Sequence, residues 1–310
     1  MPWFRLIRWK NLLIIFLTQL LAWWCVVLPA GPVVLTTLNF LLISLSTLLI
    51  AAAGYIINDY FDIKIDLINR PDKVVLAKVI PRKQAITAHT ALNFVALIAA
   101  GIVAIRSRQP LCLLFQVNCT LLLWFYSTHF KRQYVTGNVV VALLSAFTVI
   151  VLIAYEPSMV NKITEAGITA NSAYHRGINP VYVLIVYALF AFLLTWMREI
   201  VKDMEDLVGD VEEGCVTMPV KWGLTGAVKI TRVLGVLVMA ALFWCSAFLV
   251  RSGNLLLGYY LLLFVVLPLI GLMVYLGREL TPIHFKKVSS WLKIIMVSGI
   301  FSLVVYKYLV

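Results

Sequence analysis

Acidic side chains are scarce in this chain and are concentrated in two short blocks. Of its 14 acidic residues, 11 lie either between Asp59 and Asp72 or between Glu199 and Glu213. The first block, NDYFDIKIDLINRPDK, directly follows 25 uncharged residues, 33–57. Carboxylates that gather at the end of an apolar run need a neutralising partner, because a desolvated charge is costly. The two blocks are therefore the first candidates for chemistry.

The two blocks share one spacing of three aspartates. In the first block they stand at i, i+3 and i+7, as Asp59, Asp62 and Asp66. The second block repeats these offsets 144 positions later, at Asp203, Asp206 and Asp210. On a helix such offsets bring three carboxylates to one face. The repeat predicts a bundle of two related halves, in which Gly209 loosens the last turn of the second set.

Like-charged carboxylates on one helix face repel each other, so we expect a cation between the two sets. Their oxygens suit Mg²⁺, which takes one or two carboxylates together with waters and phosphate oxygens. Each set could hold one ion, with a diphosphate bridging the two metals. Lysine and arginine would bind the remaining phosphate charge. The candidates near the blocks are Arg70, Lys73, Lys131, Arg132, Arg198 and Lys202.

Two other interpretations of the acidic blocks are weaker. Charge runs at membrane ends are ordinarily solvated loops, but solvation does not explain a repeated three-carboxylate spacing after equivalent helices. A cation transporter is a further alternative. Transport sites usually lie near the bilayer midplane on interrupted helices, whereas these acids follow the ends of apolar runs. Both comparisons favour a site that binds a metal and a phosphate.

The chain as a whole is much more apolar than a soluble domain. Its 310 residues are 62% hydrophobic and 13% charged, with a mean hydropathy of +0.97. Uncharged runs long enough to span a bilayer recur throughout. This predicts an all-α, polytopic membrane bundle in a single domain, residues 1–310. Five cysteines without a CxxC pair are interpreted as core residues. No small-residue cleavage site follows the basic N-terminus, so we expect that segment to remain in the protein.

Nine apolar windows predict transmembrane helices. They cover residues 11–28, 33–57, 85–105, 110–127, 138–155, 180–200, 228–250, 254–277 and 289–309. With the N-terminus inside, 20 Lys and Arg fall on inner segments and six on outer segments. This bias predicts that the N-terminus and both acidic blocks are cytoplasmic. The longest outer segment, about 156–179, carries no pattern that indicates chemistry. No basic stripe indicates nucleic-acid binding, and the oligomeric state is left open.

A diphosphate site at the mouth of an apolar bundle suits a substrate with a charged head and a long hydrocarbon tail. A polyprenyl diphosphate has this shape, and Mg²⁺ on its diphosphate would stabilise the charge that develops on the leaving group. Aromatic faces could shield the remaining allylic cation from water. The candidates at the right membrane depth are Tyr55, Tyr60, Phe61, Trp124, Phe125, Tyr126 and Trp196.

The blocks resemble the signatures of a known family. NDYFDIKIDLINRP is similar to the NDxxDxxxD…RP signature of the UbiA superfamily of intramembrane prenyltransferases, and DMEDLVGD is similar to its second signature, DxxDxxxD. LIRWKNLL and the YSTHFKR…GN segment, Tyr126 to Asn138, resemble further landmarks of the family. The likeness covers nearly the whole chain. It implies nine helices around a central apolar cavity and Mg²⁺-dependent transfer of a prenyl group.

The resemblance also implies roles for individual residues. The expected metal ligands, with Asp59 and Asp203 in supporting positions, are Asn58, Asp59, Asp62, Asp66, Asp203, Asp206 and Asp210. Four of them are expected to be catalytic, namely Asp62, Asp66, Asp206 and Asp210. The residues expected to bind diphosphate are Arg70, Lys73, Tyr126, Lys131 and Arg132. One departure is visible, because some members carry a lysine four residues after the tyrosine, where this chain has Phe130.

Acceptors in this superfamily include aromatic rings and a prenylated glycerol phosphate. The run REIVKDMEDLVGD, from Arg198, is most similar to the branch that joins a geranylgeranyl group to geranylgeranylglycerol phosphate through an ether bond. Arg198 and Lys202 would suit the phosphate of such a lipid acceptor, and Arg8 and Asn11 are further acceptor candidates at the cavity floor. An aromatic acceptor of quinone synthesis, 4-hydroxybenzoate or dihydroxynaphthoate, is the main alternative.

Overall fold

The computed structural model describes residues 1–159 and 179–309, and within them nine helical segments are long and apolar enough to cross a membrane. In chain order they are Trp9–Ala30, α3 (Thr37–Phe61), α5 (Arg82–Arg106), α6 (Leu111–Thr128), α7 (Thr136–Ala154), α9 (Pro180–Glu212), α10 (Met218–Arg251), Leu255–Tyr275 and α13 (Pro282–Leu309). The first begins with α2 (Trp9–Ala22), and the eighth consists of α11 (Leu255–Leu261), a π-helical turn and α12 (Leu267–Tyr275). Each segment matches one predicted span, and the described residues form no β-strand. The all-α membrane bundle is confirmed.

Three helices extend well beyond their predicted windows. The predicted end at residue 200 was wrong, because α9 continues without a break to Glu212. Likewise, α10 begins at Met218 and α13 at Pro282. Apolar windows detect the part of a helix that lies in lipid, whereas backbone hydrogen bonding continues into water, where charged side chains carry no penalty. The extension of α9 carries the second acidic block.

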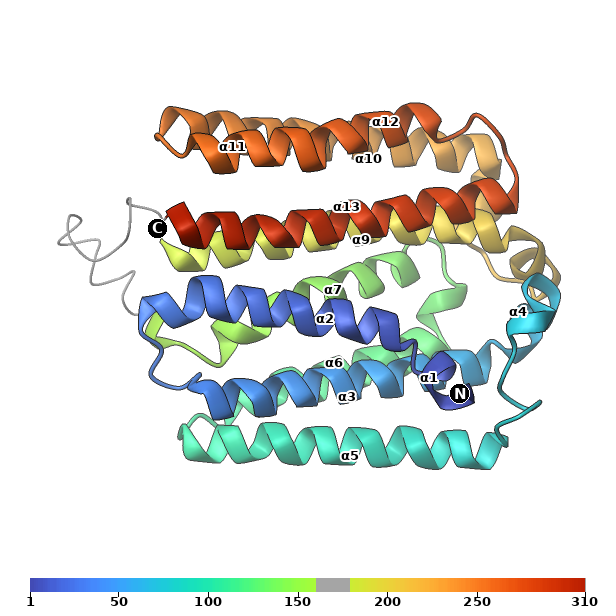
Figure 1. Cartoon of the computed structure of the whole chain (residues 1–310). Helices are drawn as coiled ribbons and strands as arrows, with labels where there is room; N and C mark the ends of the chain where they lie inside the picture. The colour runs from blue at the N-terminus through green and yellow to red at the C-terminus, as the bar shows by residue number, and fades with distance from the viewer. Residues whose placement is uncertain (160–178, 310) are drawn as a thin grey trace.

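The two acidic blocks lie at one end of the bundle. Figure 1 shows the long helices side by side, with the N-terminus, the short helix α1 (Pro2–Leu6) and α4 (Ile63–Asn69) at the same end. The last turns of α3 and α9 reach this end as well. The prediction that both blocks share one side with the N-terminus is therefore confirmed.

Helix α9 takes part in both main clusters of buried apolar side chains. One cluster joins it to the first half of the chain and includes Leu184, Leu152 and the stacked pair Trp23 and Phe40, whose ring centroids are 4.5 Å apart. The other cluster contains Met197, Ile200 and residues of α10, α12 and α13. Because α9 is packed on both sides, the positions of its acidic residues are tied to the core of the whole bundle.

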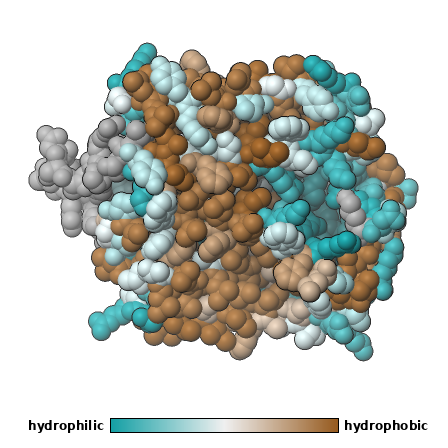
Figure 2. All heavy atoms as spheres, viewed as in Figure 1, coloured by the Kyte–Doolittle hydropathy of each residue, from teal (hydrophilic) through white to brown (hydrophobic). Residues whose placement is uncertain are grey.

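The surface shows the distribution expected of a membrane protein. In Figure 2 hydrophobic residues occupy the middle of the visible face, and hydrophilic residues gather toward its two ends. On the side where α4 lies, hydrophilic residues surround a hollow. An apolar belt of this kind is unfavourable in water and is matched by the hydrocarbon interior of a bilayer.

Glu156, at the opposite end of the bundle, has a structural role. Its side chain is fully buried and accepts backbone N–H groups of Val33, Val34 and Leu35 at 3.1, 2.8 and 2.7 Å. Buried N–H groups without partners are costly, and this carboxylate satisfies three of them in the connection between α2 and α3. The rest of the outer segment expected to lack chemistry, 160–178, lies outside the described residues.

Candidate active site

The first acidic block is not one continuous helix, contrary to the prediction. Helix α3 ends at Phe61, and Asp62 takes up φ −92° and ψ 3° before α4 begins at Ile63. The Asp62 carboxylate accepts a hydrogen bond from Asn58 Nδ2 at 2.6 Å and forms an ion pair with Lys131. Aspartate is a weak helix former, since its side chain binds nearby polar groups. The break turns α4 so that it packs against α9.

The second acidic block lies within unbroken helix, as its spacing predicts. Asp203, Asp206 and Asp210 all line one small polar pocket. The expectation that Gly209 loosens this turn was wrong, because α9 continues beyond it to Glu212. Gly209 instead leaves room for Asn69 of α4. A Cβ at this position would lie 2.5 Å from the Asn69 amide nitrogen.

Asn69 and Arg70 connect the two acidic blocks directly. Asn69 donates to the backbone oxygen of Asp206 at 3.0 Å and accepts the N–H of Gly209 at 3.0 Å. The Arg70 guanidinium pairs with Asp206 at 2.6 Å and with Glu205 at 3.1 Å. These contacts bring the end of the first block against the second. Arg70 therefore lies at the site, as predicted, and its charge is shared with two acids of α9.

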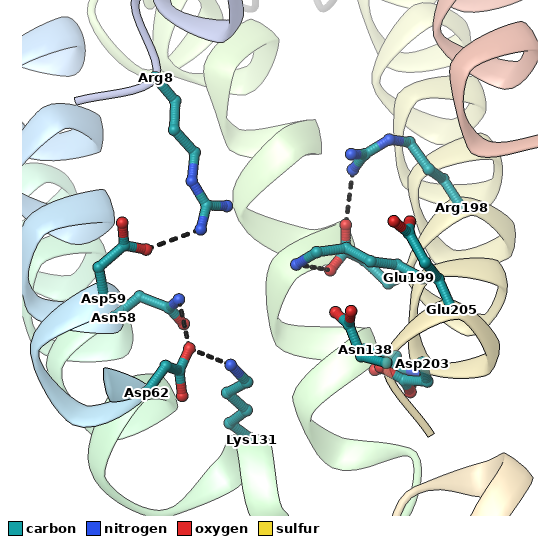
Figure 3. A network of polar contacts seen from close by, with 12 residues as sticks. Arg8, Asn58, Asp59, Asp62, Lys131, Asn138, Arg198, Glu199, Asp203 and Glu205 are labelled. Carbon is teal, nitrogen blue, oxygen red and sulfur yellow. Dashed lines mark hydrogen bonds and ion pairs between the residues drawn. The ribbon is translucent and has the colours of Figure 1, made fainter. Parts of the chain in front are cut away.

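The polar pocket combines residues from both halves of the chain. It is small, about 20 Å³, and is lined by Arg8, Asn58, Asp62, Ile65, Asp66, Arg70, Tyr126, Lys131, Asn138, Glu199, Lys202, Asp203, Asp206, Asp210 and Thr217. Figure 3 shows the side chains of the first block and Lys131 facing those of α9 and Asn138. The two aspartate sets thus meet across one pocket.

Charges in the pocket are closely coupled. Burial lowers the pKa of the Lys131 ammonium, but the adjacent Asp62 carboxylate outweighs burial and raises it, so the ion pair is maintained. Burial, together with the charges of Asp59 and Asp62, raises the pKa of Asp66 to about 6. A carboxylate whose ionisation is disfavoured by its acidic neighbours favours a bound cation. The first block therefore has the electrostatics of a cation site.

Two other predicted site residues, Asp59 and Arg132, do not line the polar pocket. Asp59 is turned toward Arg8, with a 2.7 Å ion pair, and does not line the pocket. Arg132 is exposed, and its backbone oxygen accepts the N–H of Val216 at 3.0 Å. Asn11 lines a larger, adjoining cavity, where it was expected. The side chain of Lys73 lies outside the described part of the structure.

The larger cavity is mainly apolar and adjoins the polar pocket. Its volume is about 670 Å³, and one face of α9, together with the preceding residue Asn179, lines it as far as Lys202. The residues that line both spaces are Arg8, Asn58, Tyr126, Glu199 and Lys202. Continuous polar and apolar spaces can hold a ligand with a charged head and a hydrocarbon tail. The central apolar cavity is confirmed.

The aromatic residues expected to surround the reacting carbon are only partly at this junction. Tyr55 and Tyr126 line the larger cavity. The other five do not line either space, and Phe61, Trp124 and Phe125 are exposed on the outer surface. Membrane depth estimated from sequence does not reveal which face of a helix a side chain occupies.

The donor set suits a metal ion that is completed by its substrate. Among the described residues, no three His, Cys, Asp or Glu side chains lie close enough together to hold a metal ion by themselves. Mg²⁺ sites commonly contain one or two carboxylates, with waters and phosphate oxygens as the other ligands. Two facing sets of aspartates fit this arrangement better than a cage made by protein alone.

Comparison with known proteins identifies the family. The model of the UbiA prenyltransferase family matches residues 16–308, almost the full length of the chain. The chain belongs to the UbiA prenyltransferase family. Membership in this family makes it a membrane prenyltransferase, and it removes support from the cation-transporter alternative. The resemblance seen in the two signatures is thereby confirmed.

Individual UbiA relatives are similar to this chain over most of their length. A digeranylgeranylglyceryl phosphate synthase of Thermococcus sibiricus is 32% identical over 84% of this chain and 82% of its own. The protein of the same name from Hyperthermus butylicus is 30% identical over 88% of this chain and 84% of its own. A solved digeranylgeranylglyceryl phosphate synthase has the same fold, with a TM-score of 0.63 at 24% identity over 99% of this chain and 97% of that chain. A UbiA homolog from Archaeoglobus fulgidus bound to DMAPP and Mg²⁺ shares the fold at a TM-score of 0.64 and 15% identity, over 97% and 99% of the two chains.

Several residues of this UbiA site were missed from sequence. Asn138 donates to Asp203 at 2.8 Å, and Thr217 donates to Asp210 at 3.2 Å. Asn138 ends the YSTHFKR…GN segment, which was the available signal, whereas Thr217 stands in no recognised pattern. Lys293 lines the larger cavity, although its charge in an apolar window indicated only a weak span.

The Asn69–Gly209 contact predicts a specific stability change in this UbiA protein. Alanine normally stabilises a helix relative to glycine, by about 1 kcal/mol. At Gly209 the added methyl displaces Asn69 from two hydrogen bonds, so Gly209→Ala is expected to lower stability by about 1–2 kcal/mol. Gly101, which lies in α5 with nothing within 4 Å of its Cβ position, is the matched control.

Thermal unfolding midpoints of the purified variants in detergent provide the measurement. Gly101→Ala is expected to match or exceed the parent protein, while Gly209→Ala falls below it. If both alanines shift the midpoint equally, the contact between α4 and α9 does not stabilise the site.

Proposed function

We propose that this protein transfers a geranylgeranyl group from geranylgeranyl diphosphate to geranylgeranylglycerol phosphate, in a Mg²⁺-dependent reaction that releases pyrophosphate. The observation that carries the proposal is the junction of the polar pocket with the apolar cavity, which share five lining residues. The relatives named digeranylgeranylglyceryl phosphate synthase, similar over most of both chains, support the choice of acceptor.

In this reaction the allylic carbon–oxygen bond of the donor breaks and its electron pair leaves with pyrophosphate. The hydroxyl oxygen of the acceptor bonds to the allylic carbon and releases its proton. Bound Mg²⁺ would supply charge stabilisation for the departing pyrophosphate. The residues proposed to hold it are Asn58, Asp62 and Asp66 on one side and Asp203, Asp206 and Asp210 on the other, with Asp59 in support through the first block.

Three further residues are proposed to bind and orient the diphosphate. Lys131 and Arg70 bring positive charge into the polar pocket, and Tyr126 lines both the pocket and the larger cavity. Preorganised donors of this kind stabilise charge as it develops, because they need no rearrangement during the reaction. The exposed side chain of Arg132 leaves it out of this set. A role of Lys73 in binding the diphosphate stays a prediction, since its side chain lies outside the described structure.

The prenyl tail is proposed to occupy the larger cavity. Its volume of about 670 Å³ lies in the range of pockets that enclose a ligand of this size. Tyr55 and Tyr126 lie at the end of the cavity near the acids and can shield a developing allylic cation from water. The acceptor phosphate would be bound by Arg198 and Lys202, with Arg8 and Asn11 nearby.

The topology is proposed from charge and position together. The N-terminus and both acidic blocks share one end of the bundle, and 20 of 26 Lys and Arg were assigned to that side. The positive-inside rule makes this end cytoplasmic. Water-soluble pyrophosphate would then be released to the cytoplasm, from a single integral-membrane domain spanning residues 1–310.

The test is pyrophosphate release by purified protein with geranylgeranyl diphosphate, Mg²⁺ and a panel of acceptors. The panel contains geranylgeranylglycerol phosphate, 4-hydroxybenzoate and dihydroxynaphthoate. Turnover is expected with the glycerol phosphate and is expected to be lost in an Asp62→Ala, Asp206→Ala double variant. Turnover with an aromatic acceptor alone would overturn the proposed acceptor and place the protein in quinone synthesis.

A further inference from the structure

Lys293 is a lysine of a membrane-spanning helix whose hydrogen-bond partner is a neutral group. It lies on α13 and lines the larger cavity, and its ammonium donates to Asn11 Oδ1 at 2.9 Å. A charged side chain within a membrane span is costly and ordinarily faces an interior where it meets an opposite charge. An amide oxygen orients the ammonium but leaves its charge uncompensated.

Positive charge is in excess around Lys293. Over the described residues, the charged groups that line the larger cavity are four cations, Arg8, Arg198, Lys202 and Lys293, and one acid, Glu199. Glu199 already pairs with Arg198 at 2.7 Å and with Lys202 at 3.8 Å, and Arg8 pairs with Asp59 at 2.7 Å. One carboxylate shared by two cations of α9 leaves little negative charge for a third across the cavity. The cluster has the composition of an anion site.

Arg198 has an unused donor in the same place. Its Nε is buried and has no hydrogen-bond partner within the described structure. Buried donors without partners are rare in folded proteins, and a bound ion is one of the features that account for them. The Arg198 side chain lines the larger cavity, whose wall includes Lys293 and Asn11. An anion in the cavity could be bound from both α9 and α13.

This cluster extends beyond the polar pocket into the larger cavity. Lys293, Asn11 and Arg198 line the larger cavity and not the polar pocket that contains the aspartates. Arg8, Glu199 and Lys202 line both spaces and lie between them. The polar pocket, with its many carboxylates, suits a metal-bound diphosphate, and the adjoining group of cations in the larger cavity suits a phosphate bound directly.

We propose that Lys293, oriented by Asn11, binds the phosphate of the acceptor lipid together with Arg198 of α9. This contact would select phosphorylated acceptors over uncharged ones. The inference rests on the proposed function and adds a residue on α13 to it. A phosphate monoester carries a charge of about −1.5 to −2 near neutral pH, which matches the excess of cations. An acceptor without this charge leaves the cations uncompensated, and the difference in binding provides specificity.

The experiment compares Lys293→Gln with Lys293→Arg and with Lys287→Gln, a change at an exposed lysine of the same helix. Initial rates are measured with geranylgeranylglycerol phosphate, with its dephosphorylated form, and over a range of geranylgeranyl diphosphate. Loss of one charge-assisted hydrogen bond is expected to raise the KM for the phosphorylated acceptor in Lys293→Gln by about 10- to 100-fold. The KM for the donor and the rate with the dephosphorylated acceptor should stay near the parent values. Lys293→Arg keeps the positive charge and should therefore retain most of the preference for the phosphorylated acceptor over its dephosphorylated form.

The outcomes separate the inference from the function on which it rests. A parent protein that uses the phosphorylated lipid, together with an unchanged acceptor KM in Lys293→Gln, overturns the role of Lys293 and leaves the proposed function standing. Equal increases in donor and acceptor KM also overturn it, since they indicate general damage to the site. A parent protein that uses only aromatic acceptors overturns the proposed function, and the inference with it.

Discussion

Asp62→Asn is expected to lower kcat/KM for geranylgeranyl diphosphate by at least about 10³-fold. Asp62 lies at the break between α3 and α4 and is buried in the polar pocket. Asparagine has nearly the same size and keeps one oxygen, but it lacks the charge that a cation needs. Pyrophosphate release over a Mg²⁺ titration provides the measurement, and excess Mg²⁺ is not expected to restore the rate.

Asp72→Asn is the matched control for this change. Asp72 belongs to the same acidic block, is exposed, and does not line the pocket. We expect its variant to retain the parent activity within about threefold. Asp59→Asn should fall between the two, because Asp59 acts on the site through its ion pair with Arg8. Comparable losses at positions 62 and 72 would show that block charge, rather than the pocket, supports activity.

Lys131→Gln is expected to reduce kcat/KM for the prenyl diphosphate by about 10²-fold. The Lys131 ammonium pairs with Asp62 inside the pocket, where it can also contact a bound diphosphate. Removing it takes away a positive charge from the site at which negative charge develops on the leaving group. Steady-state rates at varied donor, with acceptor held at saturation, provide the measurement. The KM for the acceptor should change much less.

Arg132→Gln tests whether position, rather than local charge, explains the effect of Lys131. The two residues are adjacent in sequence and both are cations, but Arg132 is exposed and outside the pocket. Its variant is expected to stay within about threefold of the parent. Losses of similar size in the two variants would contradict the placement of Lys131 as the residue that contacts the diphosphate.

Much of the architecture could be predicted from the sequence because it follows from local requirements. A helix that crosses a bilayer needs about 20 apolar residues, since its backbone groups must be satisfied within the segment. All nine windows therefore correspond to helices. The repeated aspartate spacing indicated paired sites, and an unbroken α9 carries the second set as expected. Prediction of helix ends was less accurate, because the apolar stretch of a helix ends at the membrane surface while the helix itself continues into water.

The details of the site depended on contacts between distant segments. Asp59 and Asp62 share a block, yet one pairs with Arg8 and the other with Lys131. Asn138 reaches Asp203, and Lys293 reaches Asn11 across 282 positions of sequence. Spacing alone places residues on one face only while the helix is continuous, and the break at Asp62 removes that condition.

Residue types along short stretches were enough to predict the membrane bundle, the end at which the acids gather and the family. Contacts between helices were needed to learn which carboxylate pairs with which cation, and which of the adjacent cations Lys131 and Arg132 enters the pocket. They were also needed to place Lys293 of α13 at the larger cavity. Side-chain direction and burial are set by how helices pack against one another. Packing brings together residues whose separation along the chain carries no signal of their contact.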